Sequence, residues 1–474
     1  MVEDKKLAVE LLKIIRHFFP DLIPRLKAVK DPRDTRYTTY DISVILLTRI
    51  LAAVFYISSM RSMTESLNDA VGIQNIAIIL GIEDLPELPH FKTINDCLEN
   101  FDPVQLQEII QVLAVKLIRC KAFLNSRLRD KYWQIIVDGS GLYTFDKRHC
   151  DQCLTRTHKD KAGNVTHVDY YHYVLEAKIV FNGSIVISIC SEFVENETIL
   201  DATAPTQTIA TLDATATAQT VAILNGTDPA QTVIEPVNNP DSKKQDCELK
   251  AFYRLADKLK ASFPKLPICL TMDSLYACQQ VFDICQKNNW QYIIRLKDGK
   301  IKTLSEEFHT LKNMEPTQSF SETINDVERH YKFVTHLDYQ GFLVNAVECI
   351  DSEVKYPFLF ITSLPITRKN CSQLVADGRR RWCIENQGFD AQKNHGYYLE
   401  HIFSEDYNAM KNHYLLIQIG HAISQLLENG LNLIKSAKLT LKMFHELLLA
   451  DFKRTVFLPE DIEYSRKPCQ YRFG

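Results

Sequence analysis

The hydrophobic pattern of this 474-residue chain changes near Lys131, and that change most constrains its fold. Before it, apolar residues recur at helical spacing, most clearly in Leu7–Phe19, Ile42–Ile57 and Leu106–Phe123. After it, short β-rich runs begin with Trp133–Val137. We therefore predict a helical N-terminal region over 1–130, followed by an α/β core. That region has room for a DNA-binding helix-turn-helix, and a packed helical prefix without DNA contact is an equal alternative.

A β-hairpin is the strongest local signal in the core. Asn182-Gly183 separates the β-rich runs His172–Phe181 and Ser184–Cys190, and Asn-Gly suits a type I′ turn because both central residues need positive φ. Beyond the hairpin, helices and strands alternate in the order helix Ser242–Phe263, strand Ile268–Met272, helix Leu275–Asn288, strand Gln291–Leu296. Three strands followed by this alternation predict a mixed sheet with helices on its faces.

Two segments interrupt the core pattern. Leu200–Glu235 is a threefold repeat of 12 residues, rich in Thr and Ala, which we interpret as an expanded surface loop. Lys300–Leu364 contains alternating runs and predicts a β-rich insertion. The expected organisation is a helical region at 1–130, the first part of the core at 131–299, the insertion at 300–364, core completion with C-terminal helices at 365–449, and a tail at 450–474.

Charge and cysteine content limit the partners and the compartment. Lys plus Arg number 55 against 59 Asp plus Glu, so a polyanionic partner needs local basic patches. The 13 cysteines are an odd number and no secretory signal pattern precedes them, which favours free thiols in the cytoplasm. The apolar stretch Ile42–Ser58 carries Arg49 and is shorter than a bilayer span, so we expect a buried helix and no membrane partner.

Three acids stand where an α/β sheet gathers reactive groups. Asp138 and Asp273 each follow a predicted strand, and carboxylates at neighbouring strand ends can share a hard cation such as Mg²⁺. Glu385 lies four residues after Arg381 in a predicted helix, so the two share a face. Taken singly, each acid is a common turn, cap or surface-pair residue. Together they suit two-metal phosphoryl transfer.

At these residues the chain resembles the DDE transposases of bacterial insertion sequences, in the IS4-like group. The resemblance covers roughly Leu88–Leu427 and rests on four stretches, IIVDGSG at Asp138, LTMDSLYA at Asp273, then QYIIRLKDG, and RRRWCIENQGFDAQKN at Glu385. It implies an RNase H-like mixed-sheet core with a β-rich insertion between the second Asp and the Glu. It also implies Asp138, Asp273 and Glu385 as the catalytic triad that binds Mg²⁺ or Mn²⁺.

The implied activity is hydrolysis of double-stranded DNA at the terminal inverted repeats of a transposon, then attack of the freed 3′-hydroxyl on target DNA by a homodimer. The family signature places a Tyr three positions before an Arg, a Glu four after it and a Lys seven after the Glu. Arg381 and Glu385 match, but Gly378 and Gln392 stand at the Tyr and Lys positions. At 100° per residue Gln392 shares the face of Glu385, and Lys393 does not. This pattern indicates a divergent branch.

Basic residues beside the acids favour DNA over a small substrate, because phosphate contacts need local cations. The predicted DNA-binding residues are Arg379, Arg380, Arg381, Trp382, Lys393, Arg295 and Lys297. Trp382 offers a ring on which a base can stack. A further basic stretch, Val115–Lys131, leads into the Asp138 strand, and a solvated helix face is the alternative there.

A Cys-x₂-Cys motif at Cys150 and Cys153, flanked by His149 and followed by His158, His167 and His172, suggests a structural Zn²⁺ site. We name His149 and His158 as candidate ligands beside the two cysteines. No second Cys-x₂-Cys accompanies the motif, so unligated cysteines in a loop are the alternative. For the whole protein, two other functions stay open: a nuclease of the same fold that joins no strands, and a DNA-binding protein without catalysis.

Overall fold

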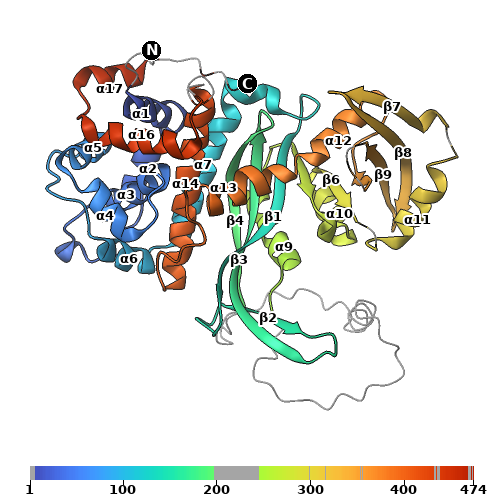
Figure 1. The fold of residues 1–474 in the computed structure, drawn as a ribbon, viewed down its shortest axis with the longest axis horizontal. Coiled ribbons are helices and arrows are strands. Elements are labelled where there is room, and N and C mark those ends of the chain that lie inside the picture. The colour runs from blue at the N-terminus through green and yellow to red at the C-terminus, as the bar shows by residue number, and fades with distance from the viewer. Residues whose placement is uncertain are drawn as a thin grey trace.

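The computed structural model describes residues 6–474 except 197–244, 298, 315, 353, 355, 432–433, 435–437, 468–470, 472 and 474. The repeat Leu200–Glu235 and the predicted helix start at Ser242 lie outside the described residues. The chain is a mixed α/β protein in which a helical region flanks one 10-stranded sheet (Figure 1). The predicted combination of a mixed sheet with many helices is therefore confirmed.

Both ends of the chain build the helical region (Figure 1). Its N-terminal part contains α1 (Leu7–Phe18), α2 (Leu22–Ala28), α3 (Ile42–Val54), α4 (Met60–Leu67), α5 (Ala70–Leu80), α6 (Phe91–Asn100) and α7 (Pro103–Arg119). Its C-terminal part contains α14 (Tyr407–Gly430), α16 (Leu441–Arg454) and α17 (Pro459–Arg466). α1 packs on α16 and α17. Residues 450–474, expected as a tail, thus contribute the end of α16 and all of α17 to this packing.

Short polar caps start several of these helices. The side chains of Asp41, Asp69 and Asp102 each accept a hydrogen bond from a backbone N–H in the first turn of α3, α5 and α7. α3 is buried throughout, as predicted for the apolar stretch. Its Arg49 donates to His413 Nδ1 of α14 at 3.0 Å and lies over the Phe403 ring. No described helix has the length and apolar character needed to cross a membrane.

The sheet positions the predicted acids. Its strands here are β1 (Trp133–Phe145), β2 (Leu154–Lys159), β3 (Val165–Phe181), β4 (Ile185–Val194), β5 (Ile268–Met272) and β6 (Gln291–Leu296). β1, β5 and β6 are parallel, whereas β3 is antiparallel to β1 and to β4. The predicted turn between β3 and β4 has φ of 48° at Asn182 and 77° at Gly183, as Asn-Gly requires. The helices α9 (Glu248–Ser262) and α10 (Gln279–Asn288) connect β4 to β5 and β5 to β6.

The β-rich insertion extends the same sheet. It contains α11 (Lys302–Leu311), β7 (Ser319–Ile324), β8 (Val327–Tyr339), β9 (Phe342–Asp351) and β10 (Phe358–Thr362). β10 pairs antiparallel with β6, and the order continues β10-β9-β8-β7 away from the core. The insertion is therefore β-rich, as expected, and its backbone hydrogen bonds are continuous with those of the core strands.

A helical crossing leads from the insertion back over the sheet (Figure 1). α12 (Cys371–Arg379) is followed by η5 (Ile384–Asp390), which is a π-helix, and by α13 (Ala391–Asn394). η5 packs Ile384 and Phe389 against Ile136 of β1 and Val180 of β3. The crossing thus brings Glu385 to the face of the sheet that carries Asp138.

Candidate metal-binding active site

Asp138 and Asp273 lie side by side on adjacent parallel strands. The last paired residues of β1 and β5 are Ile136 and Thr271. Asp138 comes two residues after Ile136, and Asp273 comes two residues after Thr271. Because side chains on a strand alternate with a period of two, both carboxylates point to one face. Asp273 also accepts a hydrogen bond from Leu275 N at 2.7 Å, which starts the short helix η3 (Ser274–Tyr276). The predicted neighbourhood of the two acids therefore follows from strand register.

Glu385 reaches the same region from η5. Its neighbour Ile384 is buried against Ile136, two residues before Asp138, while Glu385 itself is half-buried. The charges of Glu385, Glu248 and Asp273 all act on the Asp138 carboxyl. The structure thus brings the three predicted acids into one electrostatic neighbourhood.

The Asp138 carboxyl has a strongly perturbed pKa. Burial is the largest cause, and with repulsion from the three other acids it raises the pKa of Asp138 to about 7, although Arg381 acts in the opposite direction. Arg381 Nη1 donates to Asp138 Oδ2, and Gly139 N donates to Oδ1 at 3.0 Å. The side chains of Arg381 and Asp138 are only 12% and 14% exposed. A cation at this site would compete with Arg381 for Oδ2.

Glu248 is the acid that the sequence analysis missed. It begins α9, and its two carboxylate oxygens accept from Tyr173 and Tyr276 hydroxyls, each at 2.7 Å. Tyr173 in turn lies against Gly139, where an added Cβ would come within 2.3 Å of the phenol oxygen. A Glu in the first turn of a helix commonly complements the helix dipole, so its position gave no functional signal.

The carboxylates are spaced more widely than the ligands of a single ion. Among the described residues, one group of three His, Cys, Asp or Glu side chains has all ligand atoms within 4.8 Å, and it is Cys150, Cys153 and His172. The three acids do not form such a group. Two ions about 3.5–4 Å apart need a wider set of ligands.

Most of the predicted DNA-binding cations already have partners inside the protein. Arg379 pairs with Asp351 at 3.1 Å, and Arg380 pairs with Asp377 at 3.1 Å. Arg381 pairs with Asp138, as above, and Lys393 pairs with Glu400 at 3.3 Å. These interactions orient the side chains, and their role toward DNA stays a prediction.

The remaining predicted DNA-binding residues differ in their exposure. Arg295 lies over the Phe358 ring at 4.9 Å, and burial, together with repulsion from Arg381, lowers its pKa. Lys297 is exposed just after β6. Trp382 is 46% exposed, with the Arg381 guanidinium 5.2 Å from its ring. Trp382 therefore keeps an accessible ring beside the acids.

The face assignment of Gln392 rested on an α-helical rotation, whereas the segment Ile384–Asp390 is a π-helix. Each turn of the π-helical η5 takes up an extra residue, so a rotation of 100° per residue does not hold from Glu385 to Gln392. Gln392 is buried and hydrogen-bonds Gln418 and His421 of α14 at 2.8 and 2.9 Å. It therefore faces α14 and the helical region.

The predicted zinc ligands need a correction. The structure groups Cys150 and Cys153 with His172 of β3, and His149 and His158 lie outside that group. His149 Nε2 lies 2.6 Å from the Glu405 carbonyl oxygen, so this nitrogen is engaged elsewhere. His158 is on the exposed hairpin strand β2, where it contacts Asp169 at 2.7 Å. Strand pairing across the hairpin, rather than closeness in sequence, selects the third residue.

The chain matches no model of a known protein family and no curated protein sequence.

Proposed function

We propose that this protein is a DNA transposase with an RNase H-like core, in which Asp138, Asp273 and Glu385 form a DDE triad. The observation that carries the proposal is the register of β1 and β5, which sets Asp138 beside Asp273, with Glu385 supplied by η5 above β1. The order of elements supports the same core, since the antiparallel strands β1, β3 and β4, with β2 as an added hairpin strand, are followed by α9, β5, α10 and β6.

The donor set fits hard divalent cations such as Mg²⁺ or Mn²⁺. It offers carboxylate oxygens from Asp138, Asp273 and Glu385, while Glu248 adds negative charge nearby and Arg381 opposes that charge at Asp138. When bound, such ions supply activation of the attacking oxygen and stabilisation of the leaving oxygen in phosphoryl transfer. Tyr173 and Tyr276 hold Glu248 in place, and the Gly139 backbone orients one oxygen of Asp138.

The surroundings suit a DNA backbone and bases. Trp382 offers an exposed ring next to Arg381, and Lys297 offers an exposed cation after β6. Arg379 and Arg380 lie in the same crossing segment, where they pair with Asp351 and Asp377. We expect these side chains to contact the terminal inverted repeats and the target DNA in a homodimer that brings two transposon ends together.

The test uses the full chain and a linear duplex that carries the DNA flanking its coding region. We expect cleavage that depends on Mg²⁺ or Mn²⁺, followed by joining of the freed 3′ end to a second duplex. Asp138→Asn, Asp273→Asn and Glu385→Gln should each abolish cleavage and leave binding to the duplex largely intact. Asp257→Asn is the matched control, because Asp257 is an exposed carboxylate on α9.

The outcomes separate the three candidate functions. Cleavage without strand joining would identify a nuclease of the same fold, and DNA binding that Asp138→Asn leaves unchanged, without any cleavage, would identify a non-catalytic binding protein. Cleavage that survives one of the three substitutions would remove that residue from the triad.

A further inference from the structure

A second cluster of ligand-type side chains lies on the far side of β1 from Asp273. Cys150 and Cys153 are in the connection between β1 and β2, and His172 is on β3. His172 stands opposite a β-bulge, because the pairing of β1 with β3 shifts register between Gly141 and Thr144. Cys153 and His172 are buried, and Cys150 is half-buried. The proposed DNA chemistry uses none of the three.

Their distances match the edges of a metal tetrahedron. The two sulfurs are 3.7 Å apart, and His172 Nε2 lies 3.5 Å from Cys150 Sγ and 3.7 Å from Cys153 Sγ. With Zn–S near 2.3 Å and Zn–N near 2.0–2.1 Å, a tetrahedral Zn²⁺ separates two sulfurs by about 3.8 Å and sulfur from nitrogen by about 3.6 Å. A disulfide would instead need sulfurs about 2.05 Å apart.

The local hydrogen bonds also suit a thiolate pair. The Cys150 backbone N–H donates to Cys153 Sγ at 3.4 Å, and the Cys153 N–H donates to the Cys150 carbonyl at 3.2 Å, which closes a tight turn. His172 Nδ1 is buried without a hydrogen-bond partner among the described residues. Within the described part of the chain, Nε2 has the two sulfurs as its hydrogen-bonding neighbours. A buried imidazole with no oxygen or nitrogen partner at either nitrogen requires an explanation, and a metal at Nε2 provides one.

We propose that Cys150, Cys153 and His172 bind one Zn²⁺ ion, with a water molecule at the fourth corner. The soft thiolates select zinc over the Mg²⁺ or Mn²⁺ expected at the carboxylates. His149 is not assigned as the fourth ligand because it lies outside the group whose ligand atoms are all within 4.8 Å of one another. This site is independent of the proposed DNA chemistry, and its test measures metal content.

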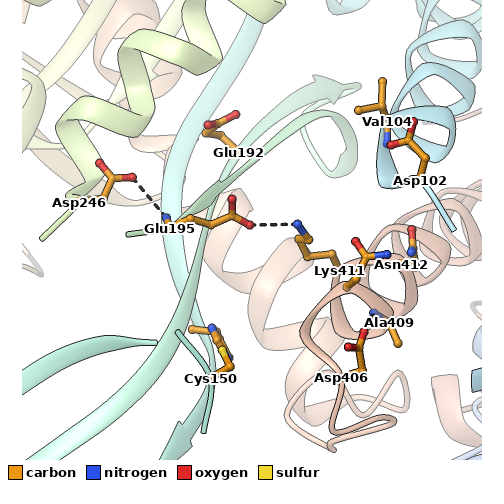
Figure 2. Close-up of polar contacts among 12 residues, drawn as sticks. Asp102, Val104, Cys150, Glu192, Glu195, Asp246, Asp406, Ala409, Lys411 and Asn412 are labelled. Carbon is orange, nitrogen blue, oxygen red and sulfur yellow. Dashed lines mark hydrogen bonds and ion pairs between the residues drawn. The ribbon is translucent and has the colours of Figure 1, made fainter. Parts of the chain in front are cut away.

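The ion would tie the β1–β2 connection to β3 beside the start of α14. The His172 ring stacks on Tyr407, the first residue of α14, with centroids 4.3 Å apart. In Figure 2, Cys150 lies below the ion pair of Glu195 with Lys411 of α14. Glu195 N also donates to Asp246 at 3.3 Å, so β4, α9 and α14 meet around the cluster. Loss of the ion should therefore loosen this junction.

The experiment measures zinc in the purified full-length protein by mass spectrometry after free metal is removed by gel filtration. We expect about one zinc per chain, as a three-residue site predicts, and replacement by Co²⁺ should give the thiolate-to-cobalt charge-transfer absorption of a tetrahedral site. Cys150→Ser, Cys153→Ser and His172→Ala should each lose the zinc and the cobalt absorption. His149→Ala, His158→Ala and Cys247→Ser are matched controls that should keep both.

His172→Cys keeps the site testable if other variants fold poorly. It retains three ligands, so zinc should stay bound and the charge-transfer absorption of the cobalt form should increase. Absence of zinc and cobalt binding in the unmodified protein would overturn the proposal, as would full zinc binding by folded Cys153→Ser. Loss of zinc from folded His149→Ala would overturn the assignment of water to the fourth corner.

Discussion

The two candidate metal sites of this protein share β1 and β3 as their support but are assembled in opposite ways. Asp138, Asp273 and Glu385 come from three segments more than 100 residues apart, and only the completed sheet brings them together. Cys150, Cys153 and His172 come from one hairpin region within the range 150–172. The carboxylate site therefore depends on the whole fold, and the sulfur site depends on one local connection.

The two sites also differ in how their charge is balanced without metal. At the carboxylates, Arg381 partly offsets a surplus of negative charge, and the pKa of Asp138 is raised, mainly by burial. At the cysteines, Cys153 Sγ accepts a hydrogen bond from the Cys150 backbone N–H, and Cys150 Sγ contacts the His172 imidazole. The comparison teaches that one sheet can offer a hard, charge-rich site and a soft, compact one, which different ions would fill.

Exchange of metals should produce the largest effect and tests this distinction directly. Chelation of divalent ions should reduce DNA cleavage about a thousandfold or more, since metal stabilisation of the transition state is worth several kcal/mol. Added Mg²⁺ or Mn²⁺ should restore cleavage, and added Zn²⁺ alone should not. Cleavage rates and bound zinc are measured on the same samples.

The matched control is folded Cys153→Ser, which should need Mg²⁺ for cleavage as the unmodified protein does. If zinc alone restored cleavage, or if Cys153→Ser changed the Mg²⁺ requirement, the two sites would not be separate in the way proposed.

The local parts of this arrangement could be predicted from the sequence. The strands Ile268–Met272 and Gln291–Leu296 have the predicted bounds, because β-rich runs between polar residues leave little choice. The Asn182-Gly183 dipeptide likewise predicted a turn, and both residues have the positive φ that it requires. Asp138 and Asp273 were both expected to follow strands; Asp273 does, whereas Asp138 lies within β1, which continues to Phe145. The parallel pairing of β1 with β5 ends just before the two acids and places them side by side.

The rest depends on contacts that no local pattern encodes. His172 lies beside the cysteines because of hairpin pairing. Glu248, at the start of α9 and hydrogen-bonded by two tyrosines, lies close enough for its charge to act on Asp138. The π-helical η5 changes the rotation per residue, so the α-helical rotation assumed between Glu385 and Gln392 does not apply. The same pairing of distant strands joins the expected β-rich insertion to the core sheet through β10 and β6. These features follow from tertiary packing and not from residue spacing.

Replacement of Arg381, whose guanidinium pairs with Asp138, should have the next largest effect. At about pH 8, where Asp138 is mostly ionised in the unmodified protein in spite of its pKa of about 7, Arg381→Gln should lower the free energy of unfolding of the metal-free protein by up to about 3 kcal/mol, because the variant must protonate a mostly buried carboxylate or hold it without its partner. Mn²⁺ should raise the melting temperature of this variant more than that of the unmodified protein, since Oδ2 is no longer occupied. Chemical and thermal unfolding with and without Mn²⁺ measure both effects.

Arg379→Gln is the control, because Arg379 pairs with Asp351 at 3.1 Å instead of with a triad acid. It should show the same Mn²⁺-dependent shift as the unmodified protein. An equal shift in the Arg381 variant would contradict competition between Arg381 and a metal at Asp138.

A single methyl group next to Asp138 should have a smaller effect. In Gly139→Ala the new Cβ would lie 2.3 Å from the Tyr173 hydroxyl oxygen, so Tyr173 must move and weaken its bond to Glu248. We expect a loss of about 2 kcal/mol in unfolding free energy, as for an overpacked core. Gly141→Ala, two residues along the same strand, meets nothing within 4 Å and should change stability by less than about 0.5 kcal/mol. Similar urea midpoints for the two variants would contradict the close packing of Tyr173 on Gly139.

A buried histidine outside both sites should have the smallest effect and sharpens the contrast with His172. The imidazole of His421 is satisfied by amides, with Gln392 and Gln425 at 2.9 and 3.2 Å from Nδ1. Burial, aided by repulsion from Lys178, lowers its pKa well below the usual value, against a hydrogen bond to the Gln387 backbone. Below about pH 6.5 the His421 side chain is therefore protonated in the unfolded chain but stays neutral in the folded chain, so the free energy of unfolding falls as the pH drops.

His421→Gln should remove this contribution. The slope of unfolding free energy against pH, measured by urea titration from about pH 7 to about pH 5.5, should be shallower in the variant by up to about 1.4 kcal/mol per pH unit. Only the difference in slope is compared, because other groups titrate equally in both proteins and the substitution itself changes the absolute stability. Zinc binding should stay at the level of the unmodified protein, since His421 already has amide partners. Equal slopes would show that His421 titrates normally, and loss of zinc would show that the sulfur site depends on α14 more widely than its three ligands imply.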